Sequence, residues 1–101
     1  MQIKNKVTED KFVISLCGEI DQHSSQRVKE HLDEIIEKSA KNKILFDFGG
    51  ISFMDSTGIG IILGRYKKFK PFGKVFFITN ANATVDKIMK LSGIYEIMPR
   101  I

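Results

Sequence analysis

Ser56 is the side chain with the widest choice of chemistry, because it lies in the stretch Asp55-Ser56-Thr57 at the predicted start of a helix. A serine hydroxyl in such a place can act as a nucleophile, cap the helix or accept a phosphoryl group. Each role needs different neighbours. The residues around Ser56 therefore indicate which of these three roles the sequence favours.

The nucleophile role finds little support in those neighbours. A nucleophile elbow needs the pattern Gly-x-Ser-x-Gly and a general base such as histidine. Met54, not glycine, stands two residues before Ser56. The only histidines, His23 and His31, flank or lie within the first predicted helix. We therefore do not expect a hydrolase or any other enzyme.

Cofactor and metal motifs are also missing from the sequence. The glycines of Gly58-x-Gly60-x-x-x-Gly64 have the wrong spacing for a dinucleotide fingerprint, and we expect a seven-residue loop between the preceding strand and this helix. No Cys, His, Asp or Glu residues have the spacing of metal ligands. The sequence predicts neither a bound cofactor nor a metal.

The phosphoacceptor role fits the surroundings of Ser56. A phosphate there would meet free backbone N–H groups and the positive end of the helix dipole, so the fold should tolerate it. About two negative charges beside Asp55 would nevertheless alter a docking surface, since they would be desolvated or would face mismatched groups. The sequence thus favours an electrostatic gate on binding. A plain helix cap at Ser56 is the alternative.

The helix that carries Ser56 should run from about residue 56 to residue 69, with Ser56 or Thr57 as its N-cap. Helical periodicity predicts one buried stripe along it. The stripe consists of Ile59, Ile62, Leu63, Tyr66 and Phe69. The opposite face holds Thr57, Gly60, Ile61, Gly64, Arg65 and Lys68.

Glycines on this face need an explanation, because each costs roughly 1 kcal/mol of helix stability relative to alanine. We favour close approach by another protein surface, with Gly60 and Gly64 at its border. The alternative is that the glycines serve packing inside the protein. In that case Gly58 shapes the turn into the helix, while Gly60 and Gly64 let the helix sit close to its own sheet.

Hydrophobic periodicity predicts an α/β fold with three helices and a mixed sheet of four to five strands. The order is strand, strand, helix, strand, helix, strand, helix, strand. The expected ranges are 3–7, 12–18, 24–40, 44–48, 56–69, 74–79, 82–93 and 95–98. The first two strands should form a hairpin, and right-handed crossovers should join the later ones. Gly49-Gly50 should end the central strand in a turn.

The first predicted helix is amphipathic, and Ser24 can cap it. Its apolar stripe is Val28, Leu32, Ile35 and Ile36. Its solvent-exposed side carries the favourable ion pairs Lys29/Asp33 and Glu34/Lys38, each four residues apart.

Length and composition indicate one ordinary globular domain over residues 1–101, with 43% hydrophobic and 28% charged residues. No apolar run approaches the roughly 20 residues that span a bilayer, and the N-terminus lacks the apolar core of a signal peptide. We therefore expect a cytoplasmic protein without a membrane contact. The lone Cys17, in an apolar strand pattern, should be a small core residue.

A net charge of +4 invites a nucleic-acid interpretation. The basic residues are scattered, however, and the densest group lies at the C-terminal end of the Ser56 helix, where the helix dipole favours cations. This group is Arg65, Lys67, Lys68 and Lys70. We expect no direct binding to nucleic acid.

A resemblance to the STAS domains that act as anti-sigma factor antagonists is carried by Ser52-Phe-Met-Asp-Ser-Thr-Gly-Ile-Gly-Ile-Ile-Leu-Gly-Arg-Tyr-Lys67. Gly18-Glu-Ile-Asp21 is similar to the family's second motif and Leu91-Ser-Gly-Ile94 to its third, so the resemblance covers nearly the whole chain. The segment Leu63-Gly-Arg-Tyr-Lys67 is most similar to the sporulation branch of the family. Asp55-Ser-Thr-Gly58 is shared with the general-stress antagonists.

The resemblance implies a regulatory protein. In this family the unphosphorylated antagonist binds an anti-sigma factor that is also an ATP-dependent serine kinase, which frees the sigma factor. The kinase phosphorylates the motif serine and so drives the antagonist off, and a serine phosphatase restores it. By this resemblance Ser56 is the phosphoacceptor and Asp55 its acidic neighbour, while ATP belongs to the partner.

The same resemblance implies where the partner docks. Thr57, Gly58 and Ile61 would line the docking face, and Glu19 and Asp21 would add contacts from a loop before the first helix. Asp21 has the alternative role of capping a turn. We expect a monomer when free. Other possible functions are a general-stress antagonist and a structural or transporter-associated STAS module.

Overall fold

A four-stranded sheet forms the centre of the structure, a computed structural model that describes residues 1–101. The strands lie in the order β1 (Gln2–Val7), β2 (Lys11–Ile20), β3 (Lys43–Met54) and β4 (Val75–Thr79). The α-helices are α1 (Ser25–Lys38), α2 (Ser56–Phe69) and α3 (Ala83–Ser92), and the short 3-10 helices are η1 (Lys70–Phe72) and η2 (Ile94–Glu96). The predicted α/β class, three helices and mixed sheet are confirmed.

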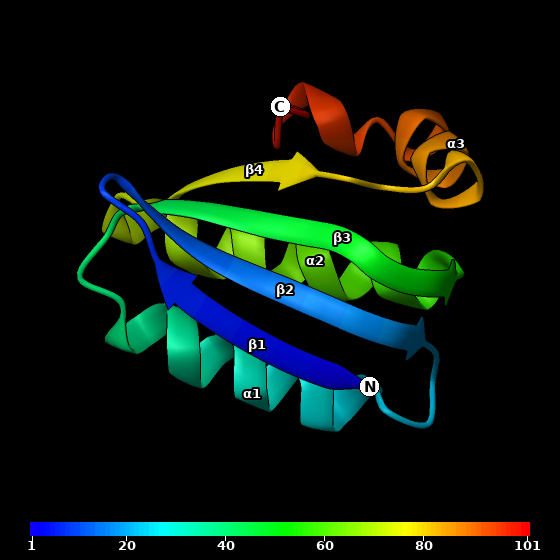
Figure 1. Ribbon diagram of the computed structural model, residues 1–101, viewed down its shortest axis with the longest axis horizontal. Coiled ribbons are helices and arrows are strands. Elements are labelled where there is room, and N and C mark those ends of the chain that lie inside the picture. Colours follow the sequence, from blue (N-terminus) through cyan, green and yellow to red (C-terminus); the bar gives the residue numbers. More distant parts are fainter.

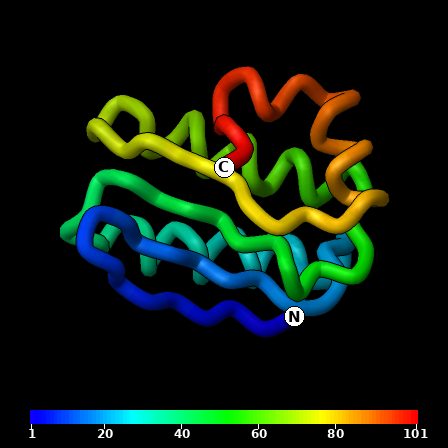
Figure 2. The backbone as a smooth tube through the Cα atoms, turned by 45° about the horizontal axis from the view of Figure 1, so that its top comes forward, coloured from blue at the N-terminus to red at the C-terminus, as the bar shows by residue number.

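Strand directions bring three strand ends to one edge of the sheet. β1 and β2 form the predicted antiparallel hairpin, whereas β2, β3 and β4 are parallel to one another. α1 and α2 cover the same face of the sheet, and α3 lies beyond β4 (Figure 1). Parallel strands place their C-terminal ends at the same edge. The chain therefore leaves β2, β3 and β4 at one end of the molecule (Figure 2).

The core lies between the sheet and the helices. Alternate strand residues are buried against it, and the rings of Phe46 and Phe76 stack with their centroids 5.8 Å apart. α1 contributes the buried residues Val28, Leu32 and Ile36, with Ile35 half-buried at the margin. The stripe predicted for the first helix is therefore confirmed. A period of two in the strands and of 3.6 in the helices produces this packing.

β3 is longer than predicted. Gly49-Gly50 does not end the strand, which continues to Met54, so the expected seven-residue loop is wrong. The Cβ of a side chain at Gly50 would lie 2.9 Å from the carbonyl oxygen of Leu16 in β2. The pairing of β2 with β3 also shifts register here. The glycines thus mark an irregularity inside the strand, where the backbones come close.

β2 is also longer than predicted. It runs to Ile20, so Glu19 lies in a strand and not in a loop. Gly18 has φ +115°, which favours glycine, at a second shift of the register. Cys17 is exposed, so the prediction of a core cysteine is wrong. Strand alternation places Cys17 on the opposite face of the sheet from the buried Leu16.

The predicted last strand, residues 95–98, is wrong. Gly93 ends α3 in the left-handed conformation, at the limit of the predicted range 82–93, but the chain then forms η2. Ile94 and Met98 are both buried, and a separation of four residues suits a helical turn better than a strand. Of the residues after α3, only Arg100 pairs with β4, through one parallel bridge to Ile78.

Candidate functional site

α2 begins at Ser56, but its N-cap is Asp55. The backbone of Asp55 is extended (φ −110°, ψ −165°), and its Oδ1 accepts a hydrogen bond from the backbone N–H of Thr57 at 2.8 Å. The prediction of Ser56 or Thr57 as the cap is therefore wrong. A carboxylate caps as well as a hydroxyl and also interacts favourably with the helix dipole.

Ser56 is exposed in the first turn of α2, directly after the cap. Its hydroxyl makes no hydrogen bond to the rest of the chain. Thr57 is half-buried, and its N–H already bonds to Asp55. Of the two neighbouring hydroxyls, that of Ser56 is therefore the more accessible to a modifying enzyme.

Two residues predicted to line the docking face are buried. Ile61 is only 1% exposed. A side chain at Gly58 would collide with Cγ of Met54 and would lie 2.6 Å from its sulfur. α2 contacts the sheet, α1 and α3, so its buried surface is wider than one stripe. Gly58 and Ile61 therefore belong to internal packing.

The stripe predicted for α2 is only partly buried. Ile62 and Phe69 are buried, whereas Ile59, Leu63 and Tyr66 are half-buried. The centre of the buried face is thus rotated toward Ile61 and Arg65. Periodicity gives the existence of a face, but its exact centre depends on the neighbouring elements.

Gly60 and Gly64 lie on an open face of α2. No heavy atom lies within 4 Å of a Cβ built at either position. Gly60 is exposed and Gly64 is half-buried. The structure therefore contradicts the alternative in which these two glycines let the helix sit close to its own sheet, and it leaves room for another surface.

The predicted exposure of Arg65 is wrong, because this side chain is buried against α1. Its Nε lies 2.7 Å from Oδ1 of Asp33, and Nζ of Lys68 lies 3.0 Å from Oδ2. The Arg65 contact is close but poorly aligned for a hydrogen bond, and Nη1 has no partner. Asp33 does not form the predicted pair with Lys29. It ties α1 to α2 and so positions the helix that carries the serine.

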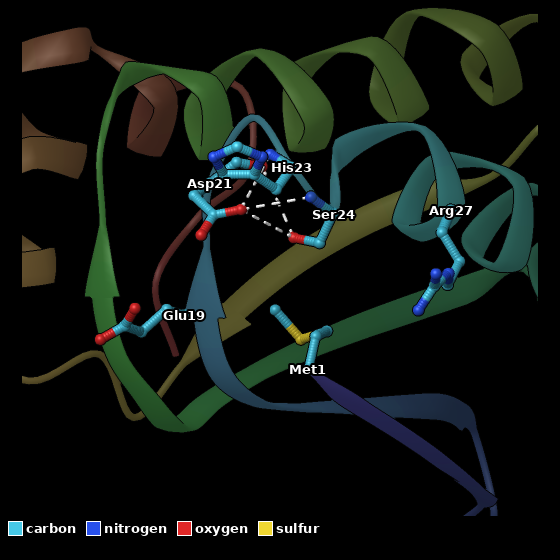
Figure 3. A pocket seen from close by; sticks show the side chains of 6 residues that line it. All are labelled: Met1, Glu19, Asp21, His23, Ser24 and Arg27. Carbon is cyan, nitrogen blue, oxygen red and sulfur yellow. Dashed lines mark hydrogen bonds between the residues drawn. The ribbon is translucent and has the colours of Figure 1, made fainter.

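Glu19 and Asp21 border an open cavity of about 470 Å³ (Figure 3). Oδ1 of Asp21 accepts hydrogen bonds from the backbone N–H groups of His23 (3.0 Å) and Ser24 (3.2 Å), so Asp21 caps the turn before α1. Ser24 stands at the N-cap of α1 without a side-chain capping bond, and its hydroxyl donates to Asp21 at 3.3 Å. The Glu19 carboxylate points away from this turn (Figure 3).

The parallel sheet brings the ends of β2 and β3 together. Ile20 pairs with Met54, so the residues that follow them, Asp21 and Asp55, leave the sheet at neighbouring positions. Together with Glu19, which is exposed near the end of β2, they bring three carboxylates to the edge of the sheet that leads into α2. Arg27 lines the same cavity as Glu19 and Asp21, so this edge carries both signs of charge, and a phosphate at Ser56 would shift the balance toward negative.

Phe53 also reaches the surface at this edge, where it is 47% exposed. Phe53 is not among the predicted site residues, because the predicted strand ends at Gly49-Gly50. Simple alternation from Phe48 would not have found it, because the register shifts leave Ile51 buried and both Ser52 and Phe53 exposed.

This arrangement of sheet, helices and serine can be compared with known proteins. Residues 2–101 match the family described as the STAS domain. The chain belongs to the STAS domain family. The STAS domain thus covers nearly all of the described residues, and the family resemblance noted in the sequence is confirmed.

This STAS domain is similar to several anti-sigma factor antagonists. It is 33% identical to the anti-sigma F factor antagonist of Paenibacillus polymyxa, over 98% of this chain and 85% of that protein. It is 28% identical to the anti-sigma-B factor antagonist of Bacillus subtilis, over 92% of this chain and 84% of that protein.

Solved structures of an anti-sigma factor antagonist are also similar to this chain. The unphosphorylated anti-sigma factor antagonist SpoIIAA aligns with a TM-score of 0.80 and 30% identity, over 99% of this chain and 88% of that chain. The phosphorylated form of SpoIIAA from Bacillus aligns with a TM-score of 0.72 and 29% identity, over 99% of this chain and 91% of that chain. The STAS domain described here therefore has the SpoIIAA fold.

The candidate site of the STAS domain consists of carboxylates, hydroxyls and glycines. No group of three or more His, Cys, Asp or Glu side chains is placed to hold a metal ion. None of the helices combines the length and the apolar character needed to cross a membrane.

Proposed function

We propose that this STAS domain is a phosphorylation-regulated anti-sigma factor antagonist. The unphosphorylated form binds an anti-sigma factor that is also an ATP-dependent serine kinase, and so releases the sigma factor. Phosphorylation of Ser56 abolishes this binding, and a serine phosphatase restores it. The observation that carries the proposal is the exposed Ser56 hydroxyl, free of hydrogen bonds, at the start of α2.

Ser56 can be modified without the loss of a structural bond. Asp55 satisfies the N–H of Thr57, so the start of α2 does not depend on the Ser56 hydroxyl. A phosphate at the first residue of a helix lies near unpaired backbone N–H groups and the positive end of the dipole. The kinase can therefore add the phosphate without unfolding the helix.

The same phosphate changes what the partner meets. Asp55 lies directly before Ser56, and Asp21 leaves the neighbouring strand, so the phosphate adds negative charge near two carboxylates. A partner that covers a neutral serine would have to desolvate about two further negative charges. A charge mismatch at an interface costs on the order of several kcal/mol, or roughly a hundredfold or more in affinity. The phosphate therefore acts as a gate on binding.

The docking surface combines an open helix face with polar groups. Gly60 and Gly64 allow close approach to the backbone of α2, because nothing occupies the space above them. Glu19 and Thr57 add polar contacts, and Asp21 holds the turn that borders the surface. The buried positions on α2 support this surface without touching the partner.

The protein acts as a substrate and not as a catalyst, and the nucleotide belongs to its partner. It works in the cytoplasm, where the kinase has ATP, and it binds neither nucleic acid nor a membrane. It is a monomer when free. The higher identity to the anti-sigma F relative than to the anti-sigma-B relative favours the sporulation branch over the general-stress branch.

Mass spectrometry after incubation with the cognate kinase and ATP tests the proposal. We expect a gain of one phosphate in the wild type and in Thr57→Ala, and none in Ser56→Ala. The phosphorylated protein should no longer co-elute with the kinase, whereas Ser56→Ala should stay bound. Full labelling of Ser56→Ala would contradict the assignment of Ser56. A wild type that is not labelled at all would overturn the proposed function.

A further inference from the structure

We infer that Phe53 is an apolar anchor for the kinase partner of this protein. The inference rests on the proposed function and adds to it the chemical character of the partner surface, an apolar pocket close to the phosphoryl-transfer site. Phe53 lies three residues before Ser56, near the C-terminal end of β3.

Exposure of Phe53 is the first observation. Phe53 is 47% exposed, whereas its strand neighbours Ile51 and Met54 are 2% and 0% exposed. Single exposed apolar residues are common on protein surfaces, so exposure alone decides nothing. What distinguishes Phe53 is the place of its ring in the structure.

The position of Phe53 places it at the end of β3 that leads into α2 and Ser56. Phe53 pairs with Glu19 in the parallel register of β2 and β3, so the ring and the carboxylate lie side by side on one face of the sheet. One residue further, Met54 pairs with Ile20 and packs into the core beneath Gly58. The ring therefore lies beside the Glu19 carboxylate, on the opposite face of the sheet from Met54.

A ring on a strand is well suited to anchor a partner. The strand fixes the backbone of Phe53, and a phenyl side chain has few torsions to lose when a partner covers it. Protein interfaces are enriched in aromatic residues at their buried centre, with polar groups at the rim. Phe53 has one such polar neighbour, the Glu19 carboxylate beside it in β2.

The burial of other candidates strengthens the case for Phe53. Gly58 and Ile61 are buried and cannot touch a partner, while Gly60 and Gly64 have no side chain to insert. The docking surface therefore extends from the start of α2 over the ends of β2 and β3. The partner must offer an apolar pocket for the Phe53 ring, together with a cation or hydrogen-bond donor for the Glu19 carboxylate.

Phosphorylation kinetics with the cognate kinase and ATP test the inference. Phe53→Ser should raise the KM for this protein roughly tenfold or more with little change in kcat, because the ring contributes to binding and not to phosphoryl transfer. Phe53→Leu, which keeps an apolar side chain, should restore most of the loss. Phe72→Ser is the matched control, since Phe72 is 75% exposed in η1 after the far end of α2 and should leave both constants unchanged.

A second measurement needs no substitution. The ring NMR signals of Phe53 in the wild type should shift or broaden when the kinase is added, and those of Phe72 should not. If the wild type is labelled at Ser56 but Phe53→Ser keeps the wild-type KM, or the Phe53 ring signals do not respond, the inference is wrong and the proposed function stands. A wild type that is not labelled would remove both.

Discussion

Asp55 and Ser56 divide two tasks that a single residue could have carried. Asp55 accepts the N–H of Thr57 at 2.8 Å and starts α2, while the Ser56 hydroxyl stays free. This division suits the proposed function, because phosphorylation of Ser56 would then remove no structural bond. The cap stabilisation of about 1 kcal/mol therefore belongs to Asp55.

Alanine at each of these two positions should separate the tasks. Asp55→Ala should lower the free energy of unfolding by about 1 kcal/mol, because the N–H of Thr57 loses its acceptor. Ser56→Ala should change it by less than about 0.5 kcal/mol, because no hydrogen bond is lost and alanine suits a helix. Urea titrations measure both values. Equal losses would show that the Ser56 hydroxyl also caps α2.

The glycines of α2 should respond to alanine in opposite directions. Gly58→Ala should lower the free energy of unfolding by about 1 to 3 kcal/mol, because the new methyl group collides with the buried side chain of Met54. Gly60→Ala is the matched control and should raise it by up to about 1 kcal/mol, because nothing lies within 4 Å. Thermal unfolding of both variants and of the wild type measures these changes in stability. A destabilised Gly60→Ala would assign Gly60 to internal packing.

At the scale of elements, one charged cluster holds α2 against α1. The side chains of Arg65 and Asp33 are only 11% and 21% exposed, whereas Lys68 is 51% exposed. A buried charge is costly unless it is paired, so the contact between Arg65 and Asp33 restricts how the two helices pack. This contact helps to fix the position of the serine at the start of α2.

Removal of Asp33 should therefore destabilise the protein more than removal of Lys68. Asp33→Ala should lower the free energy of unfolding by about 2 to 3 kcal/mol, because Arg65 is left buried without a counter-charge. Lys68→Ala should cost less than about 1 kcal/mol, since this ion pair is largely exposed. Replacing Asp33 by Leu and Arg65 by Met together should recover most of the loss. Denaturant titrations measure the free energy of unfolding of each variant. Equal losses in Asp33→Ala and Lys68→Ala would contradict the role of the buried pair.

A second charged cluster ties α3 to the C-terminal segment. Oδ1 of Asp86 accepts hydrogen bonds from the Tyr95 hydroxyl at 2.6 Å and from Arg100 at 2.9 Å, and Oδ2 lies 3.1 Å from Nζ of Lys90. The hydrogen bonds from Tyr95, Lys90 and Arg100 lower the pKa of Asp86 from 3.8 to about 2. Partial burial, followed by the bond to Asp86, raises the pKa of Tyr95. This cluster holds the segment that the sequence predicted as a strand.

The low pKa of Asp86 predicts a loss of stability in acid. The folded value of about 2 lies below the ordinary value of 3.8, so the carboxylate stabilises the fold above about pH 4, and this contribution is lost as the pH falls toward 2. Asp86→Asn should lower stability near neutral pH and remove this part of the pH dependence. Thermal unfolding of both proteins across this range measures it. Parallel pH profiles would contradict the assignment.

At the scale of the whole molecule, phosphorylation should act through charge and not through a change of fold. Amide chemical shifts should change near residues 55–60 and the adjoining strand end, because a phosphate at Ser56 faces solvent at one edge of the sheet. Ser56→Asp should fold like the wild type, since an anion suits the helix N-terminus, yet bind the kinase poorly. Widespread shifts through α1 and β4 would instead indicate a conformational switch.

The sequence by itself determined the features that depend on neighbours a few residues apart. Periodicity predicted the three helices and the four strands of the sheet, and the hydroxyl at the start of α2 was found from its own motif. Asn82 caps α3 through the N–H of Val85 at 2.9 Å, and Gly93 ends it, at the two limits of the predicted range 82–93. Caps and stops are local, so they can be recognised without the fold.

Only the tertiary structure decided which side chains a partner can reach. The burial of Ile61 and Arg65 depends on elements that are distant in the sequence and pack around α2. Gly50 stays within β3 because β2 passes close to it, and this continuation carries Phe53 to the surface. A contact surface is what the other elements leave uncovered, so it becomes defined only when all of them have packed.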